Sequence, residues 1–327
     1  MTKFKYNIIA ICLICLSSIF LSCKDDFDID KLNAKSKIVV YCFPSTADTT
    51  LISVTKSIPV RKKTKQTTIP TIDNANISYK VNGEKRNVTP KGNGQYYVVG
   101  KQKEGDKIEI EVYAEGMPSA SASTVIPKAC KIDDFQKKKV TEYSTSNLCT
   151  ETYQQIRPTF TDNPKRKDYY AVRVAMRSYK AQEYDESGNY VKEWVVTDSV
   201  MTYPEVYTDD EDLLKPLSEI DEDFGFDNDF YQRFYIFDDN TINGSQYTMR
   251  LNIPEYESVE YYDFMKKYSV ELYKLSPEYY HFIKSLNDVA NNGMAEVGLS
   301  QITPTYTNIK GGLGLLGAFN KTESIWL

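Results

Sequence analysis

Cys23 is the residue of this chain that is best placed for a chemical modification. It directly follows Ser22, at the end of an apolar N-terminal stretch that begins behind Lys3 and Lys5. Three features here are typical of a lipoprotein signal: a short positively charged start, an apolar core too short to cross a hydrocarbon layer ~30 Å thick, and a small residue before the cysteine. The sequence therefore predicts residues 1–22 as a cleaved signal peptide and Cys23 as the lipidated N-terminus. An ordinary secretory signal is the alternative.

The charged residues directly behind Cys23 predict where the anchored protein goes. Lys24, Asp25 and Asp26 resemble the signal that sends Bacteroidota lipoproteins to the outer face of the outer membrane. Two or three acyl chains hold a protein firmly, because each buried CH₂ contributes ~0.8 kcal/mol. We therefore expect an outer-membrane protein that faces the cell exterior, with residues 23–36 as an acidic tether. A solvated tether without an export function is the alternative.

The remaining cysteines of the mature chain are Cys42, Cys130 and Cys149. An odd number in an oxidising compartment predicts one disulfide and one free thiol. Because Cys130 and Cys149 are the nearer pair and flank one polar stretch, the sequence predicts a disulfide between them. The chain has no C-x-x-C motif, so neither a zinc site nor a redox dithiol is indicated.

Groups that could act as catalysts are few. His281 is the only histidine, and helical spacing puts it on a polar face with Lys284, Ser285 and Asp288. A serine or cysteine hydrolase would need His281 as its base, and no G-x-S-x-G motif surrounds any serine. The acidic segment 205–229 lacks the EF-hand spacing, although calcium binding and a glycosidase carboxylate pair stay open. The sequence therefore predicts no catalytic residue, no metal and no cofactor, and favours a protein that is not an enzyme.

The same acidic segment predicts a docking loop, with a solvated, mobile loop as the alternative. Phe224, Phe226 and Phe230 stand among its carboxylates, as in segments that become ordered on contact with a partner. The chain also has 26 tyrosines, and Tyr is enriched both in β-strands and at interfaces. A net charge of −5 is unfavourable for nucleic-acid binding, so we expect no nucleic-acid partner.

Most of the mature chain has the pattern of β-structure. Short apolar or alternating runs are bounded by turn residues, which is typical of strands. We predict a small immunoglobulin-like or transthyretin-like sandwich over residues 37–127 and a larger β-rich domain over 128–327 that contains one helix near the C-terminus. The predicted strands are 37–43, 51–58, 77–81, 95–99, 107–114, 168–180, 190–201, 230–237, 246–253 and 268–275.

The predicted helix has a clear start and end. Ser276 can cap it, Pro277 suits its first position, and Gly293 can close it. An apolar stripe at helical spacing predicts the face that packs on the sheet. The glycines of the segment 311–319 lack the spacing of a phosphate loop, so we expect them to allow close backbone packing in a terminal strand.

Three segments together resemble a known family. They are the strand KIVVYCF, the helix SPEYYHFIKSLND and the terminal segment TNIKGGLGLLGAFN, in this order behind the lipoprotein signal. The chain thereby resembles a Bacteroidota outer-membrane lipoprotein family catalogued as domain of unknown function 4249. The resemblance implies a two-part β-rich protein associated with TonB-dependent transporters, and it supplies no catalytic residues.

These observations lead to one expected function and two alternatives. We expect a surface lipoprotein that works beside an outer-membrane β-barrel such as a TonB-dependent transporter, in ligand capture or partner docking. The alternatives are a surface hydrolase that acts on a glycan or peptide, and a structural or adhesion lipoprotein. A deep pocket with converging carboxylates would favour the hydrolase, whereas a broad aromatic patch would favour ligand or partner binding.

Overall fold

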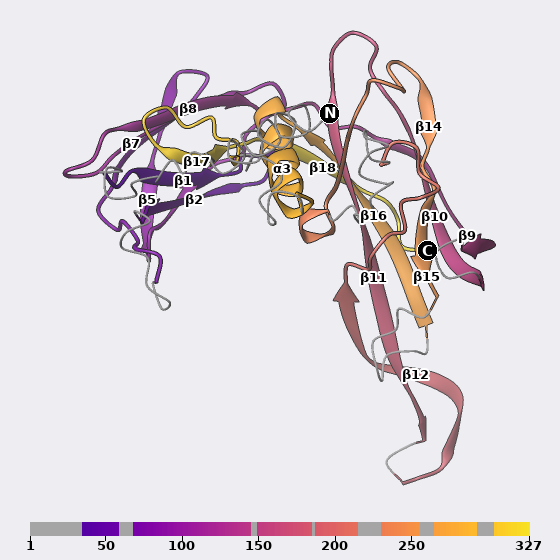
Figure 1. The fold of residues 1–327 in the computed structure, drawn as a ribbon. Coiled ribbons are helices and arrows are strands. Elements are labelled where there is room, and N and C mark those ends of the chain that lie inside the picture. The colour runs from indigo at the N-terminus through magenta and orange to yellow at the C-terminus, as the bar shows by residue number, and fades with distance from the viewer. Residues whose placement is uncertain are drawn as a thin grey trace, which may run out of the picture. The chain divides into compact units, whose positions relative to one another are not determined.

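The computed structural model describes residues 35–58, 68–144, 149–184, 187–214, 230–255, 265–292 and 304–327. The described part is mainly β, with one α-helix near the C-terminus, as the sequence predicts (Figure 1). Cys23 and the signal residues Lys24, Asp25 and Asp26 lie outside the described residues. No described helix has both the length and the apolar composition needed to cross a membrane.

The first half of the chain forms a two-sheet sandwich. Alternation places every second side chain of a strand in the core, as the buried Ile38, Val40 and Cys42 show. The first sheet has the order β17-β1-β2-β6-β5, and the second has the order β4-β3-β7-β8. The strands are β1 (Ile38–Cys42), β2 (Thr49–Lys56), β3 (Asn76–Val81), β4 (Glu84–Arg86), β5 (Val88–Gly92), β6 (Gln95–Val99), β7 (Lys107–Tyr113) and β8 (Ala120–Val125).

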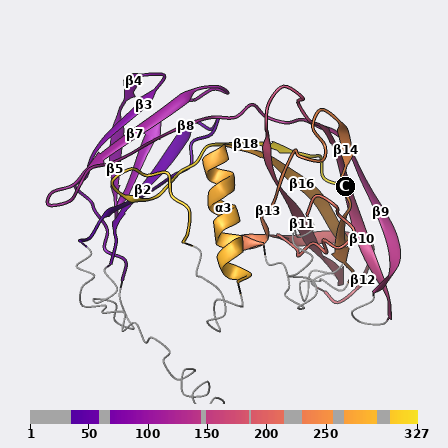
Figure 2. The same cartoon turned by 45° about the horizontal axis from the view of Figure 1, so that its top comes forward.

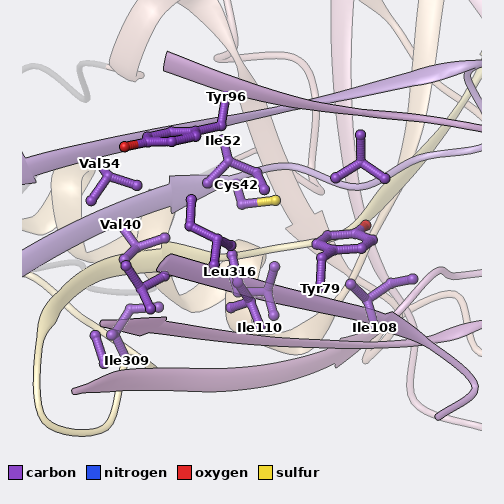
Figure 3. Packing of buried hydrophobic residues seen from close by; sticks show 14 of the residues in the cluster. Val40, Cys42, Ile52, Val54, Tyr79, Tyr96, Ile108, Ile110, Ile309 and Leu316 are labelled. Atoms are coloured by element: carbon purple, nitrogen blue, oxygen red, sulfur yellow. The ribbon is translucent and has the colours of Figure 1, made fainter. Parts of the chain in front are cut away.

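Side chains of both sheets fill the core of this sandwich. Ile52, Tyr96 and Ile110 all belong to one buried cluster (Figure 3). The buried Tyr79 hydroxyl donates to Gln102 Oε1 at 3.0 Å, and Gln102 Nε2 donates to Thr50 at 2.6 Å. The polar atoms inside the core are therefore paired with each other, which removes the cost of burying them alone.

One strand of the first sheet comes from the far end of the chain. β17 (Leu313–Leu316) pairs with β1 in parallel, with Val39 opposite Leu313. Lys310 exchanges backbone hydrogen bonds with Ser121 of β8, so the same C-terminal segment also bonds to the second sheet. The first sandwich therefore includes a strand from beyond the predicted boundary at residue 127.

The second half forms another pair of sheets. One sheet has the order β14-β10-β15 with β9 on β10, and the other has the order β12-β11-β16-β18 with β13 on β11. Ile156 and Leu251 of one sheet share a buried cluster with Val172 and Leu272 of the other. The strands are β9 (Ile132–Ser144), β10 (Cys149–Thr161), β11 (Tyr169–Tyr184), β12 (Tyr190–Thr202), β13 (Tyr235–Asp238), β14 (Gln246–Thr248), β15 (Leu251–Pro254), β16 (Met265–Leu275) and β18 (Phe319–Glu323).

Two predicted strands differ from the observed ones. The predicted strand 230–237 begins with the short 3-10 helix η3 (Tyr231–Arg233), because Gln232 has a positive φ of 53° that turns the chain. The predicted strand 246–253 is divided into β14 and β15. There the backbone N–H of Arg250 donates to the Glu211 carboxylate at 2.6 Å and not to a neighbouring strand.

The helix α3 (Pro277–Ala290) begins and packs as predicted, with one exception. The Ser276 hydroxyl accepts from Tyr279 N at 3.4 Å, and Pro277 occupies the first turn. The helix lies against β17, η3 and the sheet of β11 and β16. Figure 2 shows it beside β13, which pairs with β11 in that sheet. Ser285, predicted on the polar face, is buried, and its hydroxyl accepts a hydrogen bond from Tyr306 N at 2.8 Å.

The predicted disulfide between Cys130 and Cys149 is not formed. Cys130 is a buried free thiol, two residues before Ile132, which pairs with Phe160 at one end of the β9–β10 ladder. Cys149 begins β10 at the other end of that ladder. At ~3.3 Å per residue the two backbones are roughly 40 Å apart, whereas a disulfide needs Cα atoms within about 7 Å. Proximity in sequence misleads here because both strands are long.

Candidate functional site

The described residues enclose one concave site with aromatic walls, which we call the aromatic pocket. Its volume is about 510 Å³, within the range of pockets that hold small molecules. Ten of its lining side chains are aromatic or aliphatic, and one, Arg173, carries a charge. The lining residues are Tyr41, Phe43, Arg173, Tyr231, Gln232, Phe234, Tyr273, Tyr279, Phe282, Ile283, Leu286 and Phe319.

Regular strand and helix geometry builds the walls of the aromatic pocket. On β1 the alternation that buries Val40 and Cys42 in the sandwich turns Tyr41 to the opposite face. There the Tyr41 ring meets Phe282 of α3 edge-on, with ring centroids 6.0 Å apart. Phe43 meets Tyr279 of the same helix at 5.1 Å. The pocket thus lies where the first sandwich, α3 and the second pair of sheets come together.

Arg173 gives this apolar site its one cationic group. Along β11 the neighbours Val172 and Val174 enter the core, so Arg173 points to the opposite face of the sheet. Its guanidinium lies 3.6 Å from the ring centroid of Tyr203. This stacking fixes the orientation of the planar guanidinium group. Within the described part of the chain its buried Nε has no hydrogen-bond partner. A bound anionic group would supply one.

The rim of the aromatic pocket carries backbone strain. Gln232 and Arg233 have positive φ values of 53° and 55°, a region that non-glycine residues adopt at a cost of ~1–3 kcal/mol. Arg233 Nη1 donates to the backbone oxygen of Tyr203 at 2.5 Å, which helps to hold this turn beside Arg173. Strained backbone of this kind clusters at binding sites, where it fixes the position of a side chain.

A cluster of polar and charged side chains lies in the core of the second pair of sheets. We call Asp162, Asp168, Tyr170 and Lys274 the charged network. All four are buried, and Lys274 is only 3% exposed. Lys274 Nζ lies 3.8 Å from Asp162 and donates to the Tyr170 hydroxyl at 2.6 Å, and it forms an ion pair with Asp168. Burial lowers the pKa of Lys274 and raises the pKa of Tyr170.

Alternation along β16 is a sequence signal for the charged network. Val270, Leu272 and Lys274 alternate along β16, and the first two are core residues. A lysine that continues an inward-facing apolar series must either be paired in the core or disrupt it. The partners of Lys274 come from the start of β11 and from the end of β10. No local sequence pattern identifies these partners, because they are distant from Lys274 in the chain.

A third feature is a pair of carboxyl groups at the sheet of β9 and β10. Asn252 Nδ2 donates to Glu142 at 3.1 Å and to Asp210 at 2.7 Å, so it joins the two. A hydrogen bond with Asp210 raises the pKa of Glu142 to about 7, with burial as a further cause. One of the two groups therefore keeps its proton near neutral pH.

This shared proton predicts a pH-dependent effect of Glu142→Gln. The pKa of Glu142 in the folded protein lies above the ordinary value of 4.5. Protonated Glu142 therefore contributes its full stabilisation of the folded state below about pH 4.5, and this contribution is lost as the pH rises through about 7. We expect Glu142→Gln, which donates at every pH, to raise Tm at pH 8 and to change it little at pH 4.5. Thermal unfolding at both values checks this, with the exposed Glu115→Gln as the control. An equal Tm change at the two pH values would contradict the shared proton.

The predicted docking residues are only partly described. Phe224 and Phe226 lie outside the described residues. Phe230 is partly buried, packs on the cores of both α3 and the second pair of sheets, and meets Tyr235 at 5.0 Å. Phe230 therefore already packs against the described core, and its role in docking stays a prediction.

The start of the acidic segment is partly packed into the core. Val206 and Leu214 belong to the core, and Glu211 is 0% exposed. Glu211 accepts hydrogen bonds from Tyr247 and Arg250 and thereby closes the turn beside β14. His281 is exposed, as predicted, with the rings of Tyr169, Tyr280 and Tyr306 around it.

Comparisons with known proteins place residues 24–325 in one family. A search of curated proteins found no match. The family model described as "Domain of unknown function (DUF4249)" matches residues 24–325. This range contains the first sandwich, α3 and the terminal glycine segment, whose sequences carried the resemblance noted above. The chain therefore belongs to the DUF4249 family.

Proposed function

We propose that this protein is a lipid-anchored outer-membrane protein that captures a small aromatic or apolar anion in the aromatic pocket. It faces the cell exterior and works beside an outer-membrane β-barrel such as a TonB-dependent transporter, to which it passes the ligand. The observation that carries the proposal is the pairing of aromatic walls with a single cation in a concave site of about 510 Å³. The anchor and the barrel partner are supported by Cys23, by the charges behind it and by the family resemblance.

The lining of the aromatic pocket supports binding more than catalysis. Aromatic and aliphatic walls favour an apolar body through burial, worth ~25 cal/mol per Å² removed from water. Arg173 favours a carboxylate, sulfonate or phosphate on that body, because its planar fork matches such groups. No carboxylate and no nucleophilic thiol stands among the lining residues, so the pocket offers a ligand contacts and no acid–base pair.

The first prediction from this proposal concerns a fluorescent aromatic sulfonate, 8-anilinonaphthalene-1-sulfonate. We expect it to bind the folded protein at one saturable site. Phe43→Ala and Arg173→Met should each weaken binding about tenfold, equivalent to ~1.4 kcal/mol, because one removes a wall and the other the cation. Phe43 is 36% exposed, so its removal should leave the fold intact, which circular dichroism checks.

Tyr113→Ala is the matched control for this experiment. Tyr113 is a 46% exposed aromatic residue on β7 and does not line the aromatic pocket. We expect its removal to leave the affinity for the probe unchanged. Binding that does not saturate, or that weakens equally in all three variants, would show that the probe reports general apolar surface and would overturn the ligand site.

The second prediction concerns the anchor. Cys23→Ala should move the protein from the outer-membrane fraction to a soluble fraction, because no acyl chains can be attached. A variant with Ala at Lys24, Asp25 and Asp26 is the matched control. It should stay in the membrane, keep its acyl chains and become protected from protease added to intact cells. Mass spectrometry of proteins that co-purify in mild detergent tests the barrel partner. Recovery of unacylated wild-type protein from the periplasm would refute the anchor.

A further inference from the structure

The charged network places a lysine and an aspartate side by side in a buried core. Lys274 on β16 stands directly opposite Tyr170 on β11. Asp168 precedes Tyr170 by two residues, so its side chain lies on the same face of the sheet and diagonal to Lys274. The two form an ion pair in which Lys274 is 3% and Asp168 5% exposed.

A third carboxyl group reaches this pair from the facing sheet. Asp162 follows the end of β10 and is 3% exposed. One of its oxygens lies 3.8 Å from Lys274 Nζ and accepts a hydrogen bond from the Tyr170 hydroxyl. The other oxygen accepts from Gly244 N at 2.9 Å, which fixes the carboxyl plane. Asp162 is therefore held within reach of any proton that leaves Lys274.

Aromatic rings keep water away from this group. Tyr170 stacks on Phe237, with ring centroids 5.1 Å apart and planes inclined by 5°. Phe160 packs on Tyr170 at 5.4 Å and on Phe237 at 5.9 Å. Lys274 Nζ also lies 3.9 Å from the centre of the Tyr170 ring. A buried amine and a buried carboxyl group in contact, with a second carboxyl group beside them, are the components of an amide condensation.

We propose that Lys274 Nζ and Asp168 Cγ join in an intramolecular isopeptide bond. The ion pair first exchanges a proton and becomes an amine and a carboxylic acid. Nζ then attacks Cγ and forms the N–C bond, and the C–O bond of the acid breaks. Asp162 accepts a proton from the attacking nitrogen and returns it to the departing hydroxyl group, which leaves as water. No oxidant or other reactant is needed, because an ammonium and a carboxylate give an amide and one water molecule.

The surroundings favour each part of this step. Burial lowers the pKa of Lys274, which increases the fraction of the neutral, nucleophilic amine. Arg166 forms an ion pair with Asp168, its Nε lying 2.8 Å from Oδ1, where negative charge develops as Nζ attacks. Holding the two reactants in contact replaces a bimolecular encounter, an advantage that reaches ~10⁵ M or more in effective molarity.

The bond would join the residue just before β11 to the C-terminal end of β16. These strands are the two central strands of the sheet β12-β11-β16-β18, which contacts α3 and contributes Arg173 and Tyr273 to the aromatic pocket. A covalent link there constrains the unfolded chain as a disulfide does, and it survives reduction. A protein on the cell exterior is exposed to proteases and mechanical load, so such a link serves the position proposed above without depending on the ligand.

Peptide mapping of the full chain, purified from its own membrane, tests the inference. After tryptic digestion under denaturing conditions, we expect a branched peptide whose mass is the sum of the Asp168 and Lys274 peptides less one water molecule. Trypsin should also fail to cut after Lys274. Detection of both peptides in linear form, with cleavage after Lys274, would overturn the bond.

Two variants make the assignment specific. Lys274→Met removes the nucleophile, so the branched peptide must be absent. Asp162→Asn keeps the shape of the side chain but cannot accept the proton, so we expect linear peptides in a protein whose circular dichroism is unchanged. A branched peptide in Lys274→Met would place the link elsewhere, and an undiminished yield in Asp162→Asn would overturn the role of Asp162. The wild-type digest decides the main point even if a variant does not fold.

Discussion

Glu211→Ala is expected to lower the free energy of unfolding by about 3–5 kcal/mol, although Glu211 belongs to a segment whose composition is typical of a solvated loop. Its carboxylate is 0% exposed and accepts three hydrogen bonds, from Tyr247 at 2.7 Å, from Arg250 N at 2.6 Å and from Leu213 N at 3.1 Å. Each donor left buried and unpaired costs ~1–3 kcal/mol. Urea unfolding followed by circular dichroism measures the change.

The neighbouring Asp212→Ala is the matched control for this prediction. The Asp212 side chain is 66% exposed and lies 4.0 Å from Arg250, so its removal should change stability by less than ~0.5 kcal/mol. Equal effects of the two substitutions would show that the segment contributes by its charge alone. Burial raises the pKa of Glu211, so its ionisation opposes folding. The difference in the free energy of unfolding between the wild type and Glu211→Ala should therefore become smaller as the pH rises from 4.5 through the raised pKa of Glu211.

Gly314→Val is expected to be the other strongly destabilising substitution, with a loss of about 4 kcal/mol or more. Gly314 has a φ of +101°, and a Cβ atom there would collide with the backbone oxygen of Val40. Because that oxygen belongs to β1, the side chain would separate β17 from the first sheet and open the sandwich core. The measurements are the yield of soluble protein and the denaturant midpoint.

Gly105→Val separates backbone strain from collision. Gly105 also has a positive φ, of +84°, but nothing lies within 4 Å of its Cβ position. We expect it to cost only the strain of the left-handed conformation, ~1–2 kcal/mol. If Gly314→Val were no worse than Gly105→Val, β17 would tolerate displacement and the close approach to β1 would not be essential.

The amino-acid sequence determined the local elements of this protein. Alternation along β7 and β11, the Ser276 cap with Pro277 behind it, and the spacing of Phe282 and Ile283 are short-range patterns. Each acts through neighbours a few residues away, so each is readable without the fold. The close packing predicted for the terminal glycines is also confirmed, because glycine at Gly312 leaves room for the Ile38 oxygen, only 2.6 Å from where a Cβ would lie.

Tertiary structure alone decided which of these elements meet. The parallel pairing of β17 with β1 joins opposite ends of the chain and completes the first sandwich. The length of the β9–β10 ladder separates Cys130 from Cys149. The buried Glu211 accepts a hydrogen bond from the backbone N–H of Arg250, which therefore does not take part in a continuous strand over 246–253. Arg173 acquires its aromatic surroundings only when β1, α3 and β16 converge on it. Long-range contacts depend on the path that the whole chain takes through its turns and connections. Short-range periodicity carries no information about which distant segments this path brings together.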